Sequence, residues 1–155
     1  MQDPDSFAKK RVLYVDGYED NRLLLTYLLE TQGYACVAVS TVRAGLAIAS
    51  SRVFDLYILD SWYCDGNGID LCKRIRRFDH SAPIIFFSAW PMESAQQEAI
   101  NAGASAYLLK PALDDVLILT RILLTDQKPL SNRSNVATEL TRSIEARGSN
   151  PILSA

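Results

Sequence analysis

Four polar side chains, each directly after a short apolar run, could together form one chemical site. They are two carboxylates, a hydroxyl and an ammonium, in the order Asp16, Asp60, Ser88 and Lys110. Carboxylate oxygens suit a hard divalent cation such as Mg2+, while a hydroxyl and an ammonium bind phosphate oxygens. A carboxylate can also act as a nucleophile and form an aspartyl phosphate. These residue types therefore predict phosphoryl-transfer chemistry, provided that the fold brings them together.

Each of these residues alone is weak evidence for such a site. An aspartate after a strand commonly forms a turn or caps a helix. Ser88 alone is typical of a helix entry, and Lys110 alone is typical of a solvated surface charge. Four such residues, in this order and at four of five strand ends, indicate a common site far more strongly than any one of them.

Apolar runs of strand length alternate with stretches of helical spacing along the chain. The expected strands are Val12–Val15, Ala35–Val39, Leu56–Leu59, Ile84–Phe87 and Ala106–Leu109. Five helices are expected. The first passes through Leu23–Leu28 and ends at Gly33, and the third passes through Leu71, Ile75 and Phe78. The second, fourth and fifth cover Val42–Ser51, Glu93–Ala102 and Leu113–Leu124. Nearly continuous apolar strands in β-then-α repeats predict a doubly wound α/β fold, with a parallel sheet covered on both faces. Ligands of such sheets bind at the carboxyl ends of the strands, where the four polar residues stand.

Composition limits the class of protein. A chain of 155 residues can form one domain with a hydrophobic core but not two ordinary ones. Apolar residues make up 48%, charged residues 22%, and the net charge is -2, which argues against direct nucleic-acid binding or an anionic membrane surface. No apolar run is long enough to span a bilayer, and three cysteines without zinc-type spacing favour reduced thiols. We therefore expect a cytoplasmic domain that contacts no membrane.

The sequence resembles the receiver domain of two-component response regulators over roughly Lys10 to Leu124. The segments that carry the resemblance are Val12–Asp16, Phe54–Asp60 with Gly68 eight residues on, Pro83–Ala89 and Ala102–Pro111. The resemblance implies a flavodoxin-like, five-stranded parallel sheet of strand order 2-1-3-4-5 with five helices. It also implies a cis peptide bond between Lys110 and Pro111, a bond type that X-Pro sequences permit.

Site roles follow from the same resemblance, residue by residue. It implies Asp60 as phosphoacceptor, Ser88 as the hydroxyl that meets the phosphoryl group, and Lys110 as its counter-ion. Ser88 and Tyr107 take the positions of the residues that switch conformation on phosphorylation.

Metal and partners are implied in the same way. Asp16, Asp60 and the backbone carbonyl of Trp62 would hold Mg2+. The phosphoryl donor would be a sensor histidine kinase or a histidine phosphotransfer protein. The chain would be a stoichiometric phosphoacceptor that supplies groups for its own phosphorylation, and not a turnover enzyme.

The sequence departs from the family pattern at two positions near the site. The family normally has a second acid directly after the first, and here Asp16 is followed by Gly17, which predicts weakened Mg2+ binding. The residue four after the acceptor is commonly proline, and here it is Cys64. Gly17 favours an alternative, a pseudo-receiver that keeps the fold as a phosphorylation-independent protein-interaction module.

Two further alternatives have less support. A dinucleotide-binding enzyme is suggested by Gly66-Asn67-Gly68, but the motif lacks its third glycine and follows the third strand instead of the first. A phosphatase-like hydrolase with an aspartate nucleophile would need a second acid two residues after Asp60, where Trp62 stands.

The expected receiver domain covers 10–124, and a polar tail follows over 125–155, in which 135–147 has the spacing of a short helix. In the last helix of the domain, the side chains expected to face the sheet are Leu113, Val116, Leu117, Thr120 and Leu124. Ile118, Leu119 and Ile122 are then expected on its outer side, which is unusually apolar for a surface helix. We expect the tail, a homodimer or an output partner to cover that side.

Overall fold

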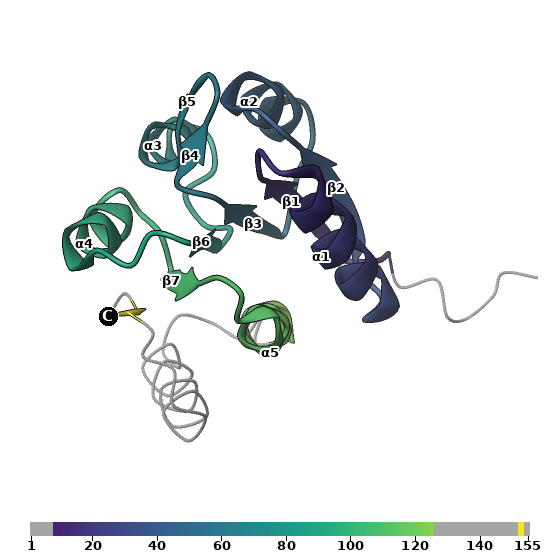
Figure 1. Cartoon of the computed structure of the whole chain (residues 1–155). Helices are drawn as coiled ribbons and strands as arrows, with labels where there is room; N and C mark the ends of the chain where they lie inside the picture. The colour runs from purple at the N-terminus through teal and green to yellow at the C-terminus, as the bar shows by residue number, and fades with distance from the viewer. Residues whose placement is uncertain (1–7, 126–151, 154–155) are drawn as a thin grey trace, which may run out of the picture.

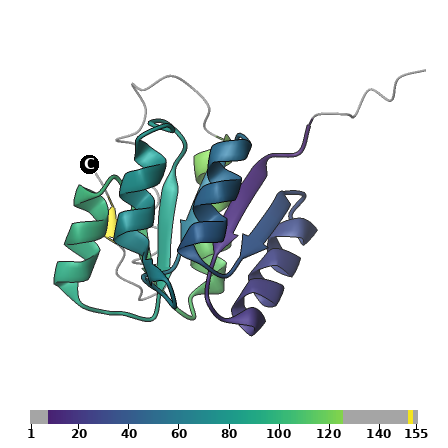
Figure 2. The same ribbon diagram turned by 90° about the horizontal axis from the view of Figure 1, so that it is seen from above.

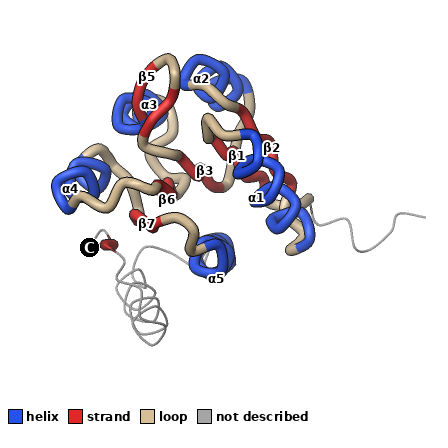
Figure 3. Tube along the Cα trace, viewed as in Figure 1, coloured by secondary structure: helices blue, strands red, loops and turns tan. Residues whose placement is uncertain are grey.

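The computed structural model describes residues 8–125 and 152–153. Helices and strands alternate along the first of these ranges (Figure 1; Figure 3). The strands are β1 Arg11–Val15, β2 Ala35–Val39, β3 Leu56–Leu59, β4 Trp62–Tyr63, β5 Gly66–Asn67, β6 Ile84–Ser88, β7 Ala106–Leu109 and β8 Ile152–Leu153. The helices are α1 Glu19–Thr31, α2 Val42–Ser51, α3 Gly68–Arg76, α4 Glu93–Asn101 and α5 Leu113–Thr125.

The main sheet has the strand order β2-β1-β3-β6-β7-β8. The first five strands pair in parallel, in the predicted 2-1-3-4-5 order, and β8 pairs with β7 in the antiparallel sense. The predicted fold class is therefore confirmed, with five parallel strands and five helices. The structure adds β8 to the edge of that sheet and folds the loop after β3 into the short hairpin β4–β5.

Two hydrophobic clusters lie on opposite faces of the sheet because successive strand residues point to opposite sides. Leu13 and Leu59 belong to the cluster under α2, α3 and α4, while Val12 and Ile58 belong to the cluster under α1 and α5. Figure 1 and Figure 2 show these two helical layers with the sheet between them. Burial on both faces explains why the strand sequences are almost entirely apolar.

Local signals in the sequence set several helix ends. Gly33 ends α1 with a φ of 89°, a left-handed conformation that favours glycine. The side chains of Thr41 and Asn67 accept hydrogen bonds from the backbone N–H groups of Ala44 and Asp70 and so cap α2 and α3. At α4, in contrast, the N-cap residue Met92 makes no side-chain cap hydrogen bond.

Arg76, the last residue of α3, ties three segments together at the end of the sheet away from the predicted site. Its guanidinium donates to the backbone carbonyls of Gly103, Asp79 and Ala82. Gly103 directly follows the end of α4, and Ala82 lies just before β6. This one side chain therefore joins the ends of α3 and α4 to the start of β6.

The prediction for the outer side of the last helix was partly wrong. Leu119 is 1% exposed and packs in the cluster under α1 and α5, whereas Ile118 and Ile122 are only half-buried. Leu119 lies three residues after Val116, so both occupy the helix face that meets the sheet. The short helix predicted over 135–147 lies outside the described residues. Within the described residues, no helix is both long enough and apolar enough to cross a membrane.

Candidate functional site

The carboxyl edge of the sheet brings the predicted residues together. Asp16 directly follows β1, Asp60 follows β3, Ser88 ends β6 and Lys110 follows β7. Strand order reverses between β1 and β3, so this edge is the switch point at which doubly wound sheets bind ligands. The fold therefore places these four side chains where the sequence predicted them.

Lys110 bridges the two carboxylates. Its Nζ donates to Oδ2 of Asp16 at 2.6 Å and to Oδ2 of Asp60 at 2.7 Å. Two carboxylates and one ammonium leave this cluster with one formal negative charge. The peptide bond between Lys110 and Pro111 is cis, as the resemblance implied.

Asp16 is completely buried, and the protein supplies donors to both of its carboxylate oxygens. The Tyr14 hydroxyl donates to Oδ2 at 2.6 Å and the Tyr18 N–H to Oδ1 at 2.8 Å, while the Asn21 amide lies 3.3–3.4 Å from both oxygens. With Lys110 added, the carboxylate has a nearly complete set of partners. A metal ion that binds Asp16 would have to displace one of them.

Asp60 is 7% exposed and has fewer partners. Its Oδ1 accepts a hydrogen bond from the backbone N–H of Ser61 at 2.6 Å, and its Oδ2 accepts from Lys110. Gly68 packs so closely against it that any added Cβ would overlap the backbone oxygen of Asp60. Only glycine therefore fits at position 68, where the chain passes close to the backbone of Asp60.

A pocket of about 530 Å³ opens above Asp60. Its lining combines the polar site with aromatic side chains, and consists of Gly17, Tyr18, Ser40, Asp60, Trp62, Tyr63, Cys64, Ser88, Ala89 and Trp90. The side chains of Trp62 and Trp90 are 62% and 44% exposed. Ser88 is buried here, and its Oγ accepts from the N–H of Trp90 at 3.2 Å. A ligand that reaches Asp60 therefore passes exposed tryptophan side chains.

Gly17 lines this pocket and leaves space. No atom lies within 4 Å of the position that a Cβ would take there, and its φ is outside the left-handed range. Glu19 and Asp20 are exposed at the start of α1. Within the described residues, no group of three or more His, Cys, Asp or Glu side chains could hold a metal ion. In this structure, neither Glu19 nor Asp20 therefore forms a three-acid group with Asp16 and Asp60.

Tyr107 points inward toward the same edge of the sheet. Its hydroxyl donates to the carbonyl oxygen of Trp90 at 2.8 Å and lies 3.2 Å from Oγ of Ser61. Its ring stacks on Phe86 with centroids 5.8 Å apart, and the residue is 2% exposed. Tyr107 thus connects Ser61, directly after Asp60, to the loop after Ser88.

Sequence reasoning missed two tyrosines that support the site. Tyr14 holds Asp16, and the hydroxyl of Tyr63 donates to the backbone carbonyl of Val15 at 3.1 Å. Burial raises the pKa of the Tyr14 hydroxyl, and the hydrogen bond to Asp16 raises it further, so Tyr14 stays a proton donor. Burial likewise raises the pKa of Tyr63 well above its usual value. The one available signal was spacing, since Tyr14 lies two residues before Asp16 and points to the same side of the strand.

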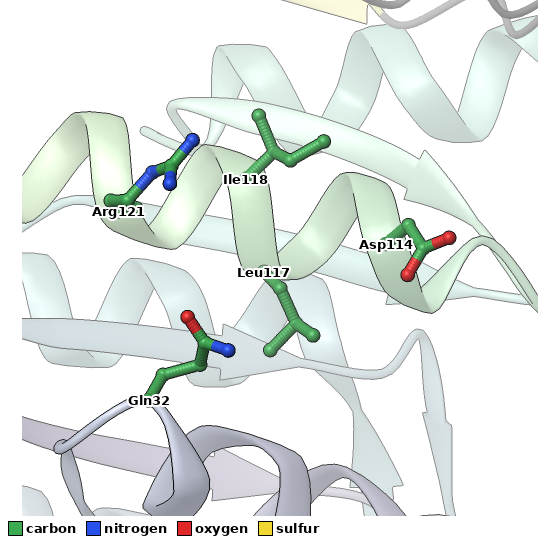
Figure 4. Close-up of a pocket in the computed structure, with 5 residues that line it drawn as sticks. All are labelled: Gln32, Asp114, Leu117, Ile118 and Arg121. Atoms are coloured by element: carbon green, nitrogen blue, oxygen red, sulfur yellow. The ribbon is translucent and has the colours of Figure 1, made fainter.

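A second pocket, of about 330 Å³, lies between the end of α1 and α5. Gln32, Asp114, Leu117, Ile118 and Arg121 line it. Figure 4 shows Leu117 directed toward Gln32, while Ile118 leaves α5 on another side. The prediction that the last helix binds a partner or a second copy is not tested by this geometry.

Five parallel strands in the order 2-1-3-4-5, with helices on both faces, define a flavodoxin-like doubly wound α/β domain. The family model "Response regulator receiver domain" matches residues 12–122. The chain belongs to this family.

Relatives of known name and a solved structure agree with this family assignment. The KDP operon transcriptional regulatory protein KdpE of Escherichia coli is 33% identical over 144 residues, which cover 88% of this chain and 64% of KdpE. The transcriptional regulatory protein BasR of Escherichia coli is 32% identical over 68% of this chain and 50% of BasR. The chain thus spans about half to two-thirds of the length of these relatives. A two-component response regulator structure from Clostridium difficile is 26% identical, with a TM-score of 0.75 over 78% of this chain and all of that one.

Proposed function

We propose that this receiver accepts a phosphoryl group on Asp60 from a phosphohistidine of a partner protein. The observation that carries the proposal is the position of Lys110, whose Nζ lies 2.7 Å from Asp60, while Ser88 lines the same pocket. An ammonium and a hydroxyl beside a carboxylate nucleophile are the groups that bind anionic phosphoryl oxygens.

In the proposed transfer, a carboxylate oxygen of Asp60 forms a bond to phosphorus while the bond between phosphorus and the imidazole nitrogen breaks. The imidazole leaves with that electron pair. Lys110 shifts its hydrogen bonds from the carboxylates to the incoming oxygens, and the Ser88 hydroxyl donates a hydrogen bond to another of them. Because Lys110 already contacts Asp60, it needs only a small movement to follow the new negative charge.

Mg2+ fits this site with fewer protein ligands than three carboxylates would give. Asp16, Asp60 and the backbone carbonyl of Trp62 would hold it, and two carboxylates are enough for Mg2+, which usually keeps several waters. The open space at Gly17 has room for such a water. When bound, the ion would neutralise charge on the phosphoryl oxygens. We expect weak binding, because Asp16 already accepts hydrogen bonds from Tyr14, Tyr18 and Lys110.

The proposed donor is a sensor histidine kinase or a histidine phosphotransfer protein in the cytoplasm, and the proposed output is a change in a protein-interaction face. The chain would react once per phosphorylation and would not turn over a substrate. The relatives that it matches are named transcriptional regulatory proteins. An output in transcription is an extension of the proposal from those names.

A pseudo-receiver is the second candidate function, and one observation favours it. The protein itself satisfies the Asp16 carboxylate, and Gly17 supplies no ligand in place of the missing acid. Under this alternative, Lys110 is the permanent cation of the site, and the fold serves only to present a surface.

Phosphorylation by a small donor tests the proposal. The protein is incubated with acetyl phosphate over a range of Mg2+ concentrations, and its intact mass is measured. We expect one hydroxylamine-sensitive phosphoryl group on the natural protein and on an Asp114→Asn control, which alters an exposed acid of α5. We expect none on Asp60→Asn. Absence of the phosphoryl group from the natural protein at every Mg2+ concentration would favour the pseudo-receiver.

A further inference from the structure

The last parallel strand of the sheet is covered by a strand from the end of the chain. β8 pairs with the outer edge of β7, with Ala106 opposite Leu153 and Tyr107 opposite Ile152. β8 also lies against α4, and Figure 2 shows it in yellow beside that helix. Residues more than forty positions apart in the sequence therefore meet at this edge.

The sequence of β7 explains why its outer edge would pair with another strand if it were left uncovered. Its four residues, Ala106–Leu109, include no charge and no proline, and three of them are buried. An apolar edge of this kind offers unpaired N–H and C=O groups to any other strand. β8 covers this edge, and its described residues are Ile152 and Leu153. Pro151 directly precedes them in the sequence, and proline is one device by which proteins prevent further pairing at an edge.

Backbone alternation shows which groups of β7 face β8. The N–H of Lys110, directly after β7, donates to the carbonyl of Ser88 at 2.9 Å, at the end of β6. Since successive N–H groups of a strand point to opposite edges, the N–H of Ala106 also faces β6, as the register of the two strands requires, and the N–H of Tyr107 points toward β8. Ile152 stands opposite Tyr107, so its N–H faces β7, whereas the N–H of Leu153 faces away.

We propose that the outer edge of β7 is a strand-acceptor site that Ile152–Leu153 of the same chain occupies, and that this occupancy prevents the edge from pairing with a second copy. The edge lies directly at Tyr107, whose hydroxyl contacts the loop after Ser88. Release of the C-terminal strand would expose a pairing edge next to that contact. The inference stands independently of phosphorylation at Asp60.

Two proline variants of the full chain form a matched pair for the test. Ile152→Pro removes the N–H that faces β7, while Leu153→Pro removes an N–H that faces away and is tolerated in an edge strand. Amide hydrogen exchange is followed residue by residue in both variants. We expect Tyr107 to exchange on the order of tenfold faster in Ile152→Pro than in the natural protein, with little change in Leu153→Pro. The amides of β2, at the opposite edge of the sheet, serve as the internal control.

A peptide of residues 147–155, added to the Ile152→Pro variant, should restore slow exchange at Tyr107. The same variant should show a concentration-dependent rise in mass by light scattering that the peptide suppresses. Equal exchange at Tyr107 in the natural protein and in Ile152→Pro would overturn the proposal. Protection in the natural protein that disappears on dilution would also overturn it, because the strand would then come from a second copy.

Discussion

The hydroxyl of Tyr14 and the ammonium of Lys110 donate to the same oxygen, Oδ2 of Asp16, each at 2.6 Å. A tyrosine two residues before the acid thus shares with the lysine an oxygen that a metal ion would need. Replacement of Tyr14 by Phe should free one acceptor position on that oxygen. We expect Mg2+ to bind several-fold more tightly, measured by Trp62 and Trp90 fluorescence, and the free energy of unfolding to fall by about 1 kcal/mol. Unchanged Mg2+ affinity would show that the Tyr14 hydroxyl does not compete with the metal.

Gly17→Asp should restore a third carboxylate at the pocket. No atom within 4 Å opposes the new side chain and the backbone is not left-handed, so we expect the free energy of unfolding to change by less than about 0.5 kcal/mol. Mg2+ should bind more tightly, and phosphorylation by acetyl phosphate should be faster at low Mg2+. Gly17→Asn, which has the same shape without the charge, is the control. An equal gain in both variants would rule out a role for the charge.

Trp62 and Trp90 should protect an acyl phosphate on Asp60 from water. Both residues line the pocket above Asp60, and both side chains are exposed. In the double variant Trp62→Ala and Trp90→Ala, we expect the phosphorylated protein to lose its phosphoryl group several-fold faster, measured by intact mass against time. Phe78→Ala, which removes an aromatic side chain that is similarly exposed but does not line the pocket, should leave the lifetime unchanged. Identical lifetimes in all three proteins would mean that the indoles do not shield the site.

Asp79 should make stability depend on pH below about pH 4. Burial works to raise its pKa, but hydrogen bonds from the N–H groups of Ala82 and Ser81 and from the Tyr57 hydroxyl, together with the charge of Arg76, outweigh burial and lower the pKa below 3.8. A lowered pKa in the folded state stabilises the protein above the unfolded pKa, and this stabilisation is lost as pH falls through the folded pKa. Urea unfolding should show Asp79→Asn less stable than the natural protein by a constant amount above pH 5.

The difference between Asp79→Asn and the natural protein should then shrink as the pH falls below 4. Asp114→Asn serves as the control for a general effect of charge. A difference that stays constant down to pH 2 would contradict the assignment of the ionised carboxylate as the hydrogen-bond acceptor.

Thr120→Val should stabilise the protein. Among the described residues, Oγ1 of Thr120 is the one buried side-chain oxygen or nitrogen without a hydrogen-bond partner. Valine has nearly the same shape and removes the cost of burying that hydroxyl, so we expect the free energy of unfolding to rise by about 1 kcal/mol in urea. Thr26→Val is the matched control, because the Thr26 hydroxyl lies 3.6 Å from the Cys36 sulfur and loses that contact. Destabilisation by both substitutions alike would show that Thr120 has a partner in solution.

The parallel strands and the four site positions could be predicted because both depend on short-range patterns. Asp16, Asp60 and Lys110 each follow an apolar run, and the carboxyl ends of parallel strands must meet at one edge. The partners of Asp16 could not be predicted in this way. Tyr14 is typical of a core residue in an apolar strand, and its spacing from Asp16 alone did not distinguish a hydrogen-bond donor from a side chain that only fills the core. The roles of Asp60, Ser88 and Tyr107 remain predictions, and the acetyl phosphate experiment tests that of Asp60.

Two other features escaped prediction for different physical reasons. β8 is a pair of residues that forms its contacts more than forty positions away, so no local period marks it. Leu119 was assigned to the outer side of the last helix because the sheet-facing stripe was drawn through Leu117. In the structure, the sheet-facing side of α5 is rotated slightly from the expected one. Leu119 is therefore buried, and Leu117 lies in the pocket of Figure 4.

Arg76 holds only one end of α4. Its guanidinium donates to the carbonyl of Gly103 just beyond the C-terminus of the helix, whereas Met92 at the N-terminus contributes no side-chain cap. A displacement of the loop after Ser88 would therefore reach the N-terminal end of α4 first and would be smallest at Gly103.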